Sequence, residues 1–318
     1  MRFKRYLWGV CYGILLTAFT GYVLLDTFLI KQVYAVIPSV QSQATETDAD
    51  TGKSGLCVQD EPGSVSGDST ASAEVIVTDR SYEDGSVSIA ITEYREYDSA
   101  IYVADIQLSS ARYLKTAFAE DAYGKNVTER TSAIAQRSGA ILAINGDYYG
   151  AQETGYVLRN GVLYRSSASK DQQDLVIYAD GSFAIITEGE ASAEALLAEG
   201  AQQILSFGPA LITDGSIAVS ETDEVGRAKS SNPRTAIGII DALHYVFVVS
   251  DGRTEESAGL SLYELAEFMR FLGVATGYNL DGGGSSTMVF NGEVINHPTS
   301  SGRSIQERSV SDIVCIGY

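Results

Sequence analysis

One stretch near the end of the chain brings together residues whose types suit catalysis. Asp281 ends an apolar run and precedes three glycines and two serines, Gly282, Gly283, Gly284, Ser285 and Ser286. Consecutive glycines allow positive φ and let backbone N–H groups face an anion such as a phosphate. An isolated glycine triplet is more often a plain turn. An acid directly before an anion site would be repelled unless it had its own task, so we interpret Asp281 as the first catalytic candidate.

Two other apolar runs end in a carboxylate beside a glycine. Residues 140–144 precede Asn145-Gly146-Asp147, and residues 245–249 precede Ser250-Asp251-Gly252. Buried strands that each deliver a carboxylate at one end can build a pocket along a sheet edge. Asp147 is the second candidate because Tyr148 beside it offers a flat surface for a sugar ring. Asp251 is the third, although this chain also uses Asp-Gly in ordinary hairpin turns.

Arg234 is the expected anion clamp of an otherwise acidic chain, with 41 acidic and 22 basic residues. A planar guanidinium binds two phosphate oxygens at once, whereas the alternative for Arg234 is a surface ion pair that stabilises little. His244 and His297 indicate no function, and no Gly-x-Ser-x-Gly or complete P-loop pattern is present. The acidic surface argues against a nucleic-acid partner.

The chain begins with a predicted membrane anchor, residues 1–31. Residues 6–25 carry no charge and follow Arg2, Lys4 and Arg5. About twenty helical residues span a bilayer, and the basic flank is expected to stay in the cytoplasm. A cleaved signal peptide is the alternative, but its apolar region is normally shorter. We therefore expect a single-pass protein of the cell membrane with its remaining chain extracytoplasmic.

A flexible acidic linker is predicted at 32–78, because most of this range is rich in Gly, Ser, Thr and acids and residues 41–75 lack aromatics. The remainder, 79–318, is long enough for one large domain. The three cysteines of the chain, Cys11, Cys57 and Cys315, have no spacing typical of a disulfide framework or a zinc site.

The domain is predicted to be α+β, with a mixed, strand-rich sheet covered by a few helices. Alternating residues indicate paired strands at 86–94 and 100–108, and turns at 160–161, 180–181, 214–215 and 291–292 indicate hairpins. Helices are expected at 126–137, 192–199 and 261–272. In the last of these, Ser261 and Glu264 have the spacing of a capping box.

Five motifs in order resemble the phosphodiester glycosidase family, over roughly residues 85–318. They are residues 145–149, 233–238, 251–253, 279–286 and 307–308. The family includes the lysosomal uncovering enzyme and many bacterial envelope proteins associated with exopolysaccharide biosynthesis. The resemblance implies hydrolysis of a sugar-1-phosphodiester at the sugar side, in an envelope or extracellular glycan. It also implies that the substrate and its phosphate are bound by Asn145, Tyr148, Arg234, Thr235, Arg253, Asn279, Gly282, Gly283, Gly284, Ser285, Ser286 and Arg308.

Two alternatives stay open from the sequence. In a metal-dependent phosphodiesterase, the three aspartates Asp147, Asp251 and Asp281 would bind Ca²⁺ or Mg²⁺ through oxygen together with the asparagines. In a module that binds envelope glycans without catalysis, the same pocket would hold its ligand unchanged. No cofactor is firmly implied, and a divalent cation remains compatible with the residues. The expected partners are a phosphodiester-linked glycan and, through the N-terminal helix, the membrane.

Overall fold

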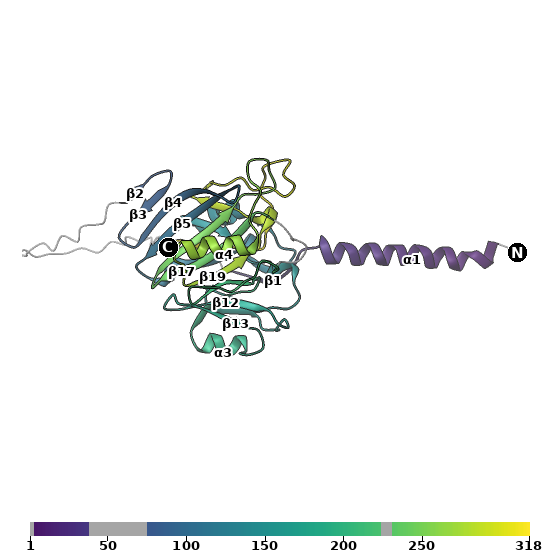
Figure 1. Ribbon diagram of the computed structural model, residues 1–318. Helices are drawn as coiled ribbons and strands as arrows, with labels where there is room; N and C mark the ends of the chain where they lie inside the picture. The colour runs from purple at the N-terminus through teal and green to yellow at the C-terminus, as the bar shows by residue number, and fades with distance from the viewer. Residues whose placement is uncertain (1–2, 38–74, 224–230) are drawn as a thin grey trace, which may run out of the picture.

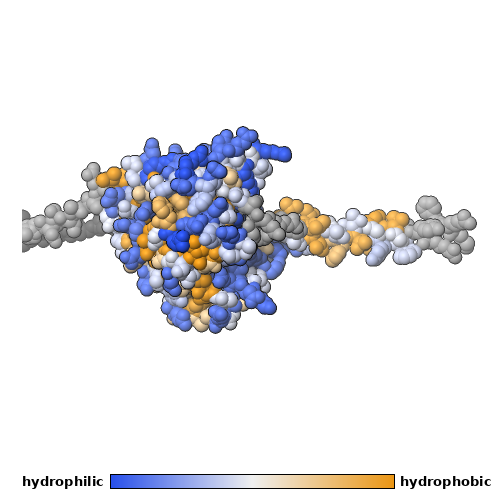
Figure 2. All heavy atoms as spheres, viewed as in Figure 1, coloured by the Kyte–Doolittle hydropathy of each residue, from blue (hydrophilic) through white to orange (hydrophobic). Residues whose placement is uncertain are grey.

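The computed structural model describes residues 3–37, 75–223 and 231–318. Helix α1 (Phe3–Phe28) extends away from the folded domain (Figure 1). Its stretch Trp8–Thr27 is long and apolar enough to cross a membrane, and none of it is buried by the rest of the protein. Figure 2 shows these hydrophobic side chains standing clear of the largely hydrophilic domain. Cys57 and most of the predicted linker lie outside the described residues.

A nine-stranded sheet forms the centre of the domain. Its order is β16-β15-β19-β17-β18-β5-β4-β3-β2. The strands are, in that order, Ser216–Ile217, Ala210–Thr213, Thr276–Leu280, Arg234–Asp241, His244–Ser250, Ser99–Leu108, Val87–Glu96, Ser81–Glu83 and Ile76–Val77.

Two five-stranded sheets and two short ribbons complete the strands of the described residues. One sheet has the order β11-β10-β14-β12-β13, with bounds Val162–Arg165, Val157–Arg159, Ala201–Leu205, Gln173–Tyr178 and Phe183–Thr187. The other has the order β21-β20-β9-β23-β6, with bounds Glu293–Val294, Met288–Phe290, Leu142–Asn145, Asp312–Ile316 and Leu114–Phe118. The ribbons pair β1 (Gln32–Val36) with β7 (Ala122–Lys125) and β8 (Glu129–Arg130) with β22 (Ser309–Val310).

Helices cover the outer faces of these sheets. Besides α1 they are α2 (Thr131–Ser138), α3 (Ala193–Ala198) and α4 (Leu262–Phe271), with 3₁₀ turns η1 (Ala111–Tyr113), η2 (Ala119–Asp121), η3 (Tyr149–Ala151) and η4 (Gly283–Ser285). Figure 1 shows α4 lying across the central sheet and α3 at the far side of β12 and β13. The strand-rich α+β class is confirmed. The predicted sheet was mixed, whereas the strand pairs are antiparallel because hairpins join many of them.

The main core lies between the sheets, and alternation along β18 shows why. Phe247 and Val249 face the core shared with β9, β12 and β23, while Val246 and Val248 face α4. All four side chains are essentially inaccessible to solvent. Since each face of β18 is covered, the apolar run ends only where the strand leaves the core, at the polar residues that follow Ser250. The same burial on both faces holds the strand ends that carry the candidate site.

Local signals in the sequence predicted several elements correctly. The turns at 160–161, 180–181, 214–215 and 291–292 each join two antiparallel strands, and Asn160, Asp214 and Asn291 have positive φ as such turns require. Ser261 and Glu264 form the capping box of α4. Strands β4 and β5 pair along their full length, as expected from their alternating residues.

Helix α2 and the predicted linker both differ from the prediction, since strands β1 and β2 (Ile76–Val77) lie within residues 32–78. Helix α2 begins at Thr131 rather than at 126, because Asn126 adopts φ 57° and Glu129–Arg130 pair with β22 instead. Strand β1 lies inside the range 32–78 that the sequence predicted as linker. It pairs with β7 directly after α1, and Asn126 Nδ2 donates to the carbonyls of Thr27 and Ile30, both at 3.1 Å.

Candidate active site at the edge of the central sheet

Three strand ends bring the candidate residues to one edge of the central sheet. The last residue of β18, Ser250, pairs with Arg234 at the start of β17, and Thr235 pairs with Leu280 at the end of β19. Asp251 and Asp281 therefore follow strand ends that lie on either side of Arg234. With neighbouring strands about 4.8 Å apart, the two strand ends are separated by about 10 Å. This edge is where the structure collects most of the predicted site.

Asp281 is the centre of a compact polar cluster. Its Oδ2 accepts hydrogen bonds from Ser285 Oγ at 2.6 Å and from Arg308 Nη2 at 2.9 Å. Arg308 Nε also donates to Ser285 Oγ at 2.9 Å. The Asp281 side chain is 13% exposed and that of Arg308 is 44% exposed, so both are open to a ligand from solvent. Burial raises the pKa of Asp281, and the Arg308 charge opposes that rise.

The glycine triplet lies against a second arginine. A Cβ at Gly283 would come within 2.9 Å of Arg253 Nη2, and Gly283 has φ +63°. Asn232 and the Ser300 carbonyl hold the Arg253 guanidinium in this position. Burial and the nearby Arg308 lower the pKa of Arg253, as expected for two cations that flank one site. Two guanidinium groups and a glycine turn are an arrangement that suits a phosphate.

The backbone of the triplet is only partly available to an anion. Gly283 N donates to the Pro233 carbonyl at 2.7 Å, which fixes the turn to the start of β17. In the part of the chain that the structure describes, the N–H groups of Gly282 and Gly284 donate to no protein acceptor. At Gly284 a Cβ would lie 2.2 Å from Ser300 Oγ, so the loop around residue 300 packs directly on the turn. A ligand could accept from two N–H groups here rather than three.

Several predicted binding residues form the support beneath this turn. Asn145 is fully buried, donates to the Asp281 carbonyl at 2.6 Å, and accepts from Thr235 Oγ1 at 2.8 Å. Asn279 donates to the Gly208 carbonyl at 2.7 Å, and Ser286 is also fully buried. Asn145 thus fixes the backbone at Asp281, and none of these three side chains lines an open surface.

Arg234 also lies beneath the site. It is 3% exposed, and its Nε donates to the Leu260 carbonyl at 2.8 Å. Its Cα and Cδ lie 3.8 Å from where a Cβ of Gly282 would be. Arg234, the predicted anion clamp, therefore lies at the expected edge of the sheet but is buried. The exposed cations at the turn are Arg253 and Arg308.

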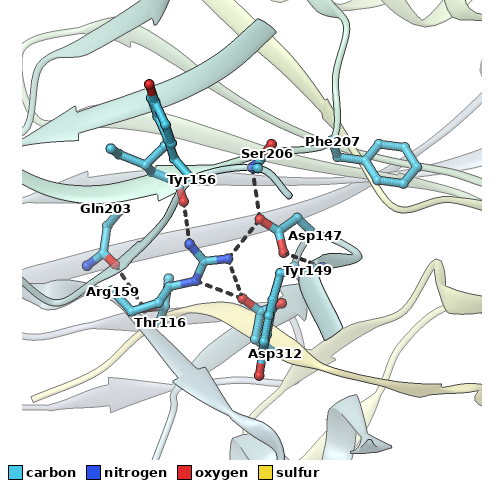
Figure 3. Close-up of polar contacts among 12 residues, drawn as sticks. Thr116, Asp147, Tyr149, Tyr156, Arg159, Gln203, Ser206, Phe207 and Asp312 are labelled. Atoms are coloured by element: carbon cyan, nitrogen blue, oxygen red, sulfur yellow. Dashed lines mark hydrogen bonds and ion pairs between the residues drawn. The ribbon is translucent and has the colours of Figure 1, made fainter. Parts of the chain in front are cut away.

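Asp147 takes part in a buried ion cluster (Figure 3). Arg159 Nη2 lies 2.8 Å from Asp147 Oδ2 and 2.8 Å from Asp312 Oδ2, and all three side chains are at most 1% exposed. The Ser206 N–H donates to Asp147 Oδ2 at 2.8 Å. One guanidinium charge serves two carboxyl groups, and burial raises the pKa of Asp312. Asp147 is thus adjacent to Asn145 but closed to solvent, whereas Tyr148 beside it is 47% exposed.

Asp251 holds the loop that contains Asn296 and His297. Its Oδ1 accepts from Asn296 Nδ2 at 3.0 Å and from the His297 backbone N–H at 2.8 Å. Its Oδ2 accepts from His297 Nδ1 at 3.1 Å. Tyr102 Oη lies 3.2 Å from the same ring nitrogen, and burial followed by the Asp251 charge raises the pKa of Tyr102. The sequence offered Asp251 as a catalytic carboxylate, and the structure places it as the partner of His297.

The three aspartates do not converge on one cation site. Asp147 faces Arg159, Asp251 faces His297, and Asp281 faces Arg308. Among the residues that the structure describes, no three His, Cys, Asp or Glu side chains are grouped so that they could bind a metal ion. The three aspartates therefore do not form one shared oxygen-ligand site in the described structure.

Sequence reasoning missed three residues of this region: Arg159, Asp312 and His297. Arg159 ends β10 and Asp312 begins β23, and a charge at the end of a buried apolar strand is a signal that a partner charge is nearby. Nothing in the sequence pairs these two, which are 153 positions apart. His297 precedes a proline in a loop and gave no local signal of its carboxylate partner.

The fold places the partly exposed Asp281 carboxylate beside two arginines and a glycine turn, an arrangement that suits a phosphate. The phosphodiester glycosidase family model matches residues 138–317, so the chain belongs to this family. The chain is 32% identical over 199 residues to mouse N-acetylglucosamine-1-phosphodiester alpha-N-acetylglucosaminidase, covering 56% of this chain and 38% of the mouse protein. It is 27% identical over 201 residues to the prophage-derived uncharacterized protein YomE of Bacillus subtilis, covering 62% of this chain and 31% of YomE.

A solved structure supports the fold independently. The zebrafish N-acetylglucosamine-1-phosphodiester alpha-N-acetylglucosaminidase catalytic domain, auto-inhibited by its pro-peptide, matches with a TM-score of 0.59 and 20% identity. The match covers 78% of this chain and 89% of the zebrafish chain. The chain matches less than two fifths of the length of the mouse and Bacillus relatives, at 38% and 31%. The described domain therefore corresponds to the catalytic part of the zebrafish protein in fold.

Proposed function

We propose that the protein is a hydrolase that cleaves a sugar-1-phosphodiester between the sugar C1 and the phosphate oxygen, in an envelope or extracellular glycan. The observation that supports this most directly is the Asp281, Ser285 and Arg308 cluster beside the glycine turn. It places one partly exposed carboxylate within a few ångströms of groups suited to hold a phosphate. Family membership supports the same reaction class.

In this proposal, the phosphate lies against the glycine turn between Arg253 and Arg308. Phosphate is already a good leaving group, so stabilising its charge matters more than protonating it. Asp281 faces the sugar C1. Its carboxylate either stabilises the oxocarbenium-like transition state by charge, or bonds to C1 as the C1–O bond to the phosphate breaks. Water finally supplies the hydroxyl at C1, and the phosphate leaves as a monoester. Tyr148 offers a flat exposed surface for the sugar ring.

Asp147 and Arg234 have positioning roles in this proposal. The ion pair of Asp147 with Arg159 fixes the chain beside Asn145, which in turn holds the Asp281 carbonyl. Arg234 supports Gly282 from below. Catalysis requires reacting groups to be held close to their productive geometry, so loss of either support is expected to reduce turnover without removing a reacting group.

We also propose that α1 anchors the domain in the cell membrane, with the domain on the extracytoplasmic side. The support is the length and apolar composition of Trp8–Thr27 and the basic residues Arg2, Lys4 and Arg5 before it. The glycan substrate would then be reached at the outer membrane surface. A chelator added to the assay tests whether a divalent cation takes part in the reaction.

The test is an assay of the full-length protein in detergent with a chromogenic sugar-1-phosphodiester, with and without a chelator. Sugar release that is unaffected by chelator and lost in Asp281→Asn is the expected result. Chelator-sensitive cleavage would support the phosphodiesterase alternative. Binding of the substrate without any turnover would support the glycan-binding alternative. Asp180→Asn, at an exposed hairpin turn, is the matched control for the loss of one carboxylate.

A further inference from the structure

A group of exposed apolar side chains surrounds the junction between α1 and the folded domain. It begins two residues after the apolar stretch Trp8–Thr27 and continues along β1. Its members, which we call the junction patch, are each at least 41% exposed and are Leu29, Ile30, Val33, Tyr34 and Val36. Contiguous exposed apolar side chains of this kind mark a surface that contacts another molecule or a membrane.

The register of β1 explains why these side chains point away from the domain. Ala35 and Ile37 pack inward on buried aromatic side chains, so Tyr34 and Val36, which alternate with them, point outward. Simple alternation would turn Val33 inward as well. The register instead shifts by one residue between Val33 and Ala35, as in a β-bulge, and Val33 is exposed on the same side as Tyr34. The outer face of this strand is therefore apolar, where a strand facing water would carry polar side chains.

The charged groups around the junction patch have polar partners of their own. The pairs are Asp26 with Gln32, Glu120 with Lys31, Asp121 and Glu129 with Arg137, and Glu153 with Lys125. These pairs contain three basic and five acidic groups, so they provide no excess positive charge that would attract anionic lipid. Attraction of the patch to a bilayer must therefore come from its apolar side chains.

The position of the junction patch matches the headgroup layer of a bilayer that α1 spans. Twenty helical residues cross a hydrocarbon core of about 30 Å, and the headgroups add roughly 5 to 8 Å on each side. Leu29 and Ile30 follow Thr27 by two and three residues, which places them in this layer. The exposed face of α1 continues into the patch, since Leu24 and Leu25 are also exposed. Tyrosine is one of the residues enriched at this depth.

We propose that the junction patch inserts into the headgroup layer and holds the folded domain against the membrane. This inference rests on the proposed anchor α1 and adds a second lipid contact to it. Transmembrane helices are commonly tilted by about 20°, and contacts of their flanking residues set the tilt. In the proposed arrangement, α1 tilts so that the outer face of β1, with Val33, Tyr34 and Val36, lies along the bilayer surface. The ligand is the lipid interface itself, and neutral lipid suffices.

Tryptophan fluorescence in a bilayer tests this contact. Trp8 is the single tryptophan, so Trp8→Phe gives a background in which one new tryptophan reports its own surroundings. Val33→Trp is placed in this background, and the full-length protein is reconstituted in nanodiscs of phosphatidylcholine brominated near the headgroup, which quenches tryptophan at short range. Val77→Trp on β2 is the matched control, because Val77 is 52% exposed against 51% for Val33 and β2 lies on the side of the domain away from α1 (Figure 1). We expect the lipid to quench Val33→Trp at least about three times as strongly as Val77→Trp.

A second substitution tests whether apolar contact is the cause. Val36→Asp, added to the Val33→Trp protein, puts a charge into the headgroup layer and should lower the lipid quenching at least about twofold, whereas Val77→Asp should leave it unchanged. Equal quenching with and without Val36→Asp would contradict the inference. Val36→Trp is a second reporter if Val33→Trp fails to fold, and far-UV circular dichroism checks the fold of each variant.

The outcomes separate the patch from the anchor. Quenching of Val33→Trp by aqueous acrylamide but not by the lipid would overturn the inference. Shielding from both would also overturn it, because a second copy or another part of the chain would then cover the patch. Trp8 of the wild-type protein reports on α1 by itself. Lipid quenching of Trp8 without quenching of Val33→Trp would leave the anchor in place and refute the patch, whereas the reverse result would support the patch and refute the anchor.

Discussion

The buried cluster of Arg159 with Asp147 and Asp312 predicts a large loss of folding stability when Arg159 is replaced. Arg159→Met keeps much of the side-chain volume and removes the only cation that contacts Asp147 and Asp312 in the described structure. Both carboxyl groups are inaccessible to solvent. Breaking a buried pair in this way typically costs about 3 to 5 kcal/mol, because a charge is left without compensation.

The free energy of protonating a buried carboxylate gives a similar cost for the loss of Arg159. Without Arg159, a carboxylate can escape burial of its charge by taking up a proton. From an ordinary aspartate pKa of about 3.9, this costs about 4 kcal/mol at pH 7 and about 1.5 kcal/mol at pH 5. Since burial already raises the pKa of Asp312, most of the new cost falls on the second carboxyl. The variant should therefore be destabilised more at pH 7 than at pH 5.

Urea unfolding of the detergent-solubilised protein measures this difference. Far-UV circular dichroism is the suitable signal, because the single tryptophan, Trp8, lies in α1 rather than in the domain. Arg130→Met, at an exposed arginine, is the control and should change the unfolding free energy by less than about 0.5 kcal/mol. Adding Asp147→Asn and Asp312→Asn to the Arg159→Met variant should recover much of the loss. A loss below about 1 kcal/mol, or one independent of pH, would refute the reasoning.

Three further predictions concern the site and the anchor. Asp281→Asn should fold normally and lose on the order of 100-fold in turnover, and near-normal sugar release would remove Asp281 from the chemical step. The Arg308 charge lowers the pKa of Asp281, and activity that needs the carboxylate falls as pH drops through that pKa. In Arg308→Gln the acid limb of the pH–rate profile should therefore lie at higher pH. An unmoved limb would contradict this assignment. Protease added to intact cells should remove the domain beyond α1, whereas a domain protected until lysis would contradict the proposed topology.

The sequence predicted those parts of the fold that depend on neighbouring residues. The Asn-Gly and Asp-Gly turns need positive φ at fixed positions, and the capping box of α4 needs only Ser261 and Glu264. The pairing of β18 with β5 joins residues about 140 positions apart, such as His244 and Gln107. Both strands are largely apolar in sequence. No local pattern distinguishes that partner from other apolar strands.

The site shows the same division. Asp281 and its glycines are contiguous, so their role as one unit was visible in the sequence, and the late Arg308 was found through the family motif. Asp147 and Asp251 were recognised as strand-end carboxylates, but their side-chain partners come from distant segments, Arg159 and His297. Whether a carboxylate faces solvent or a buried cation depends on those partners. Exposure could therefore not be predicted from the motif alone.

Strand β1 has a mechanical consequence for the proposed membrane protein. It pairs with β7 only four residues after α1 ends, and Lys31 contacts Glu120 at the same place. A catalytic domain on a long free tether would sweep a volume whose radius grows with the tether. In the proposed anchored protein the domain is instead fastened beside the end of α1, so its distance from the bilayer surface would be fixed. In the proposed anchored hydrolase, glycans whose scissile bond lies at that distance from the bilayer would be reached, and substrate would be found by lateral diffusion of the protein in the membrane.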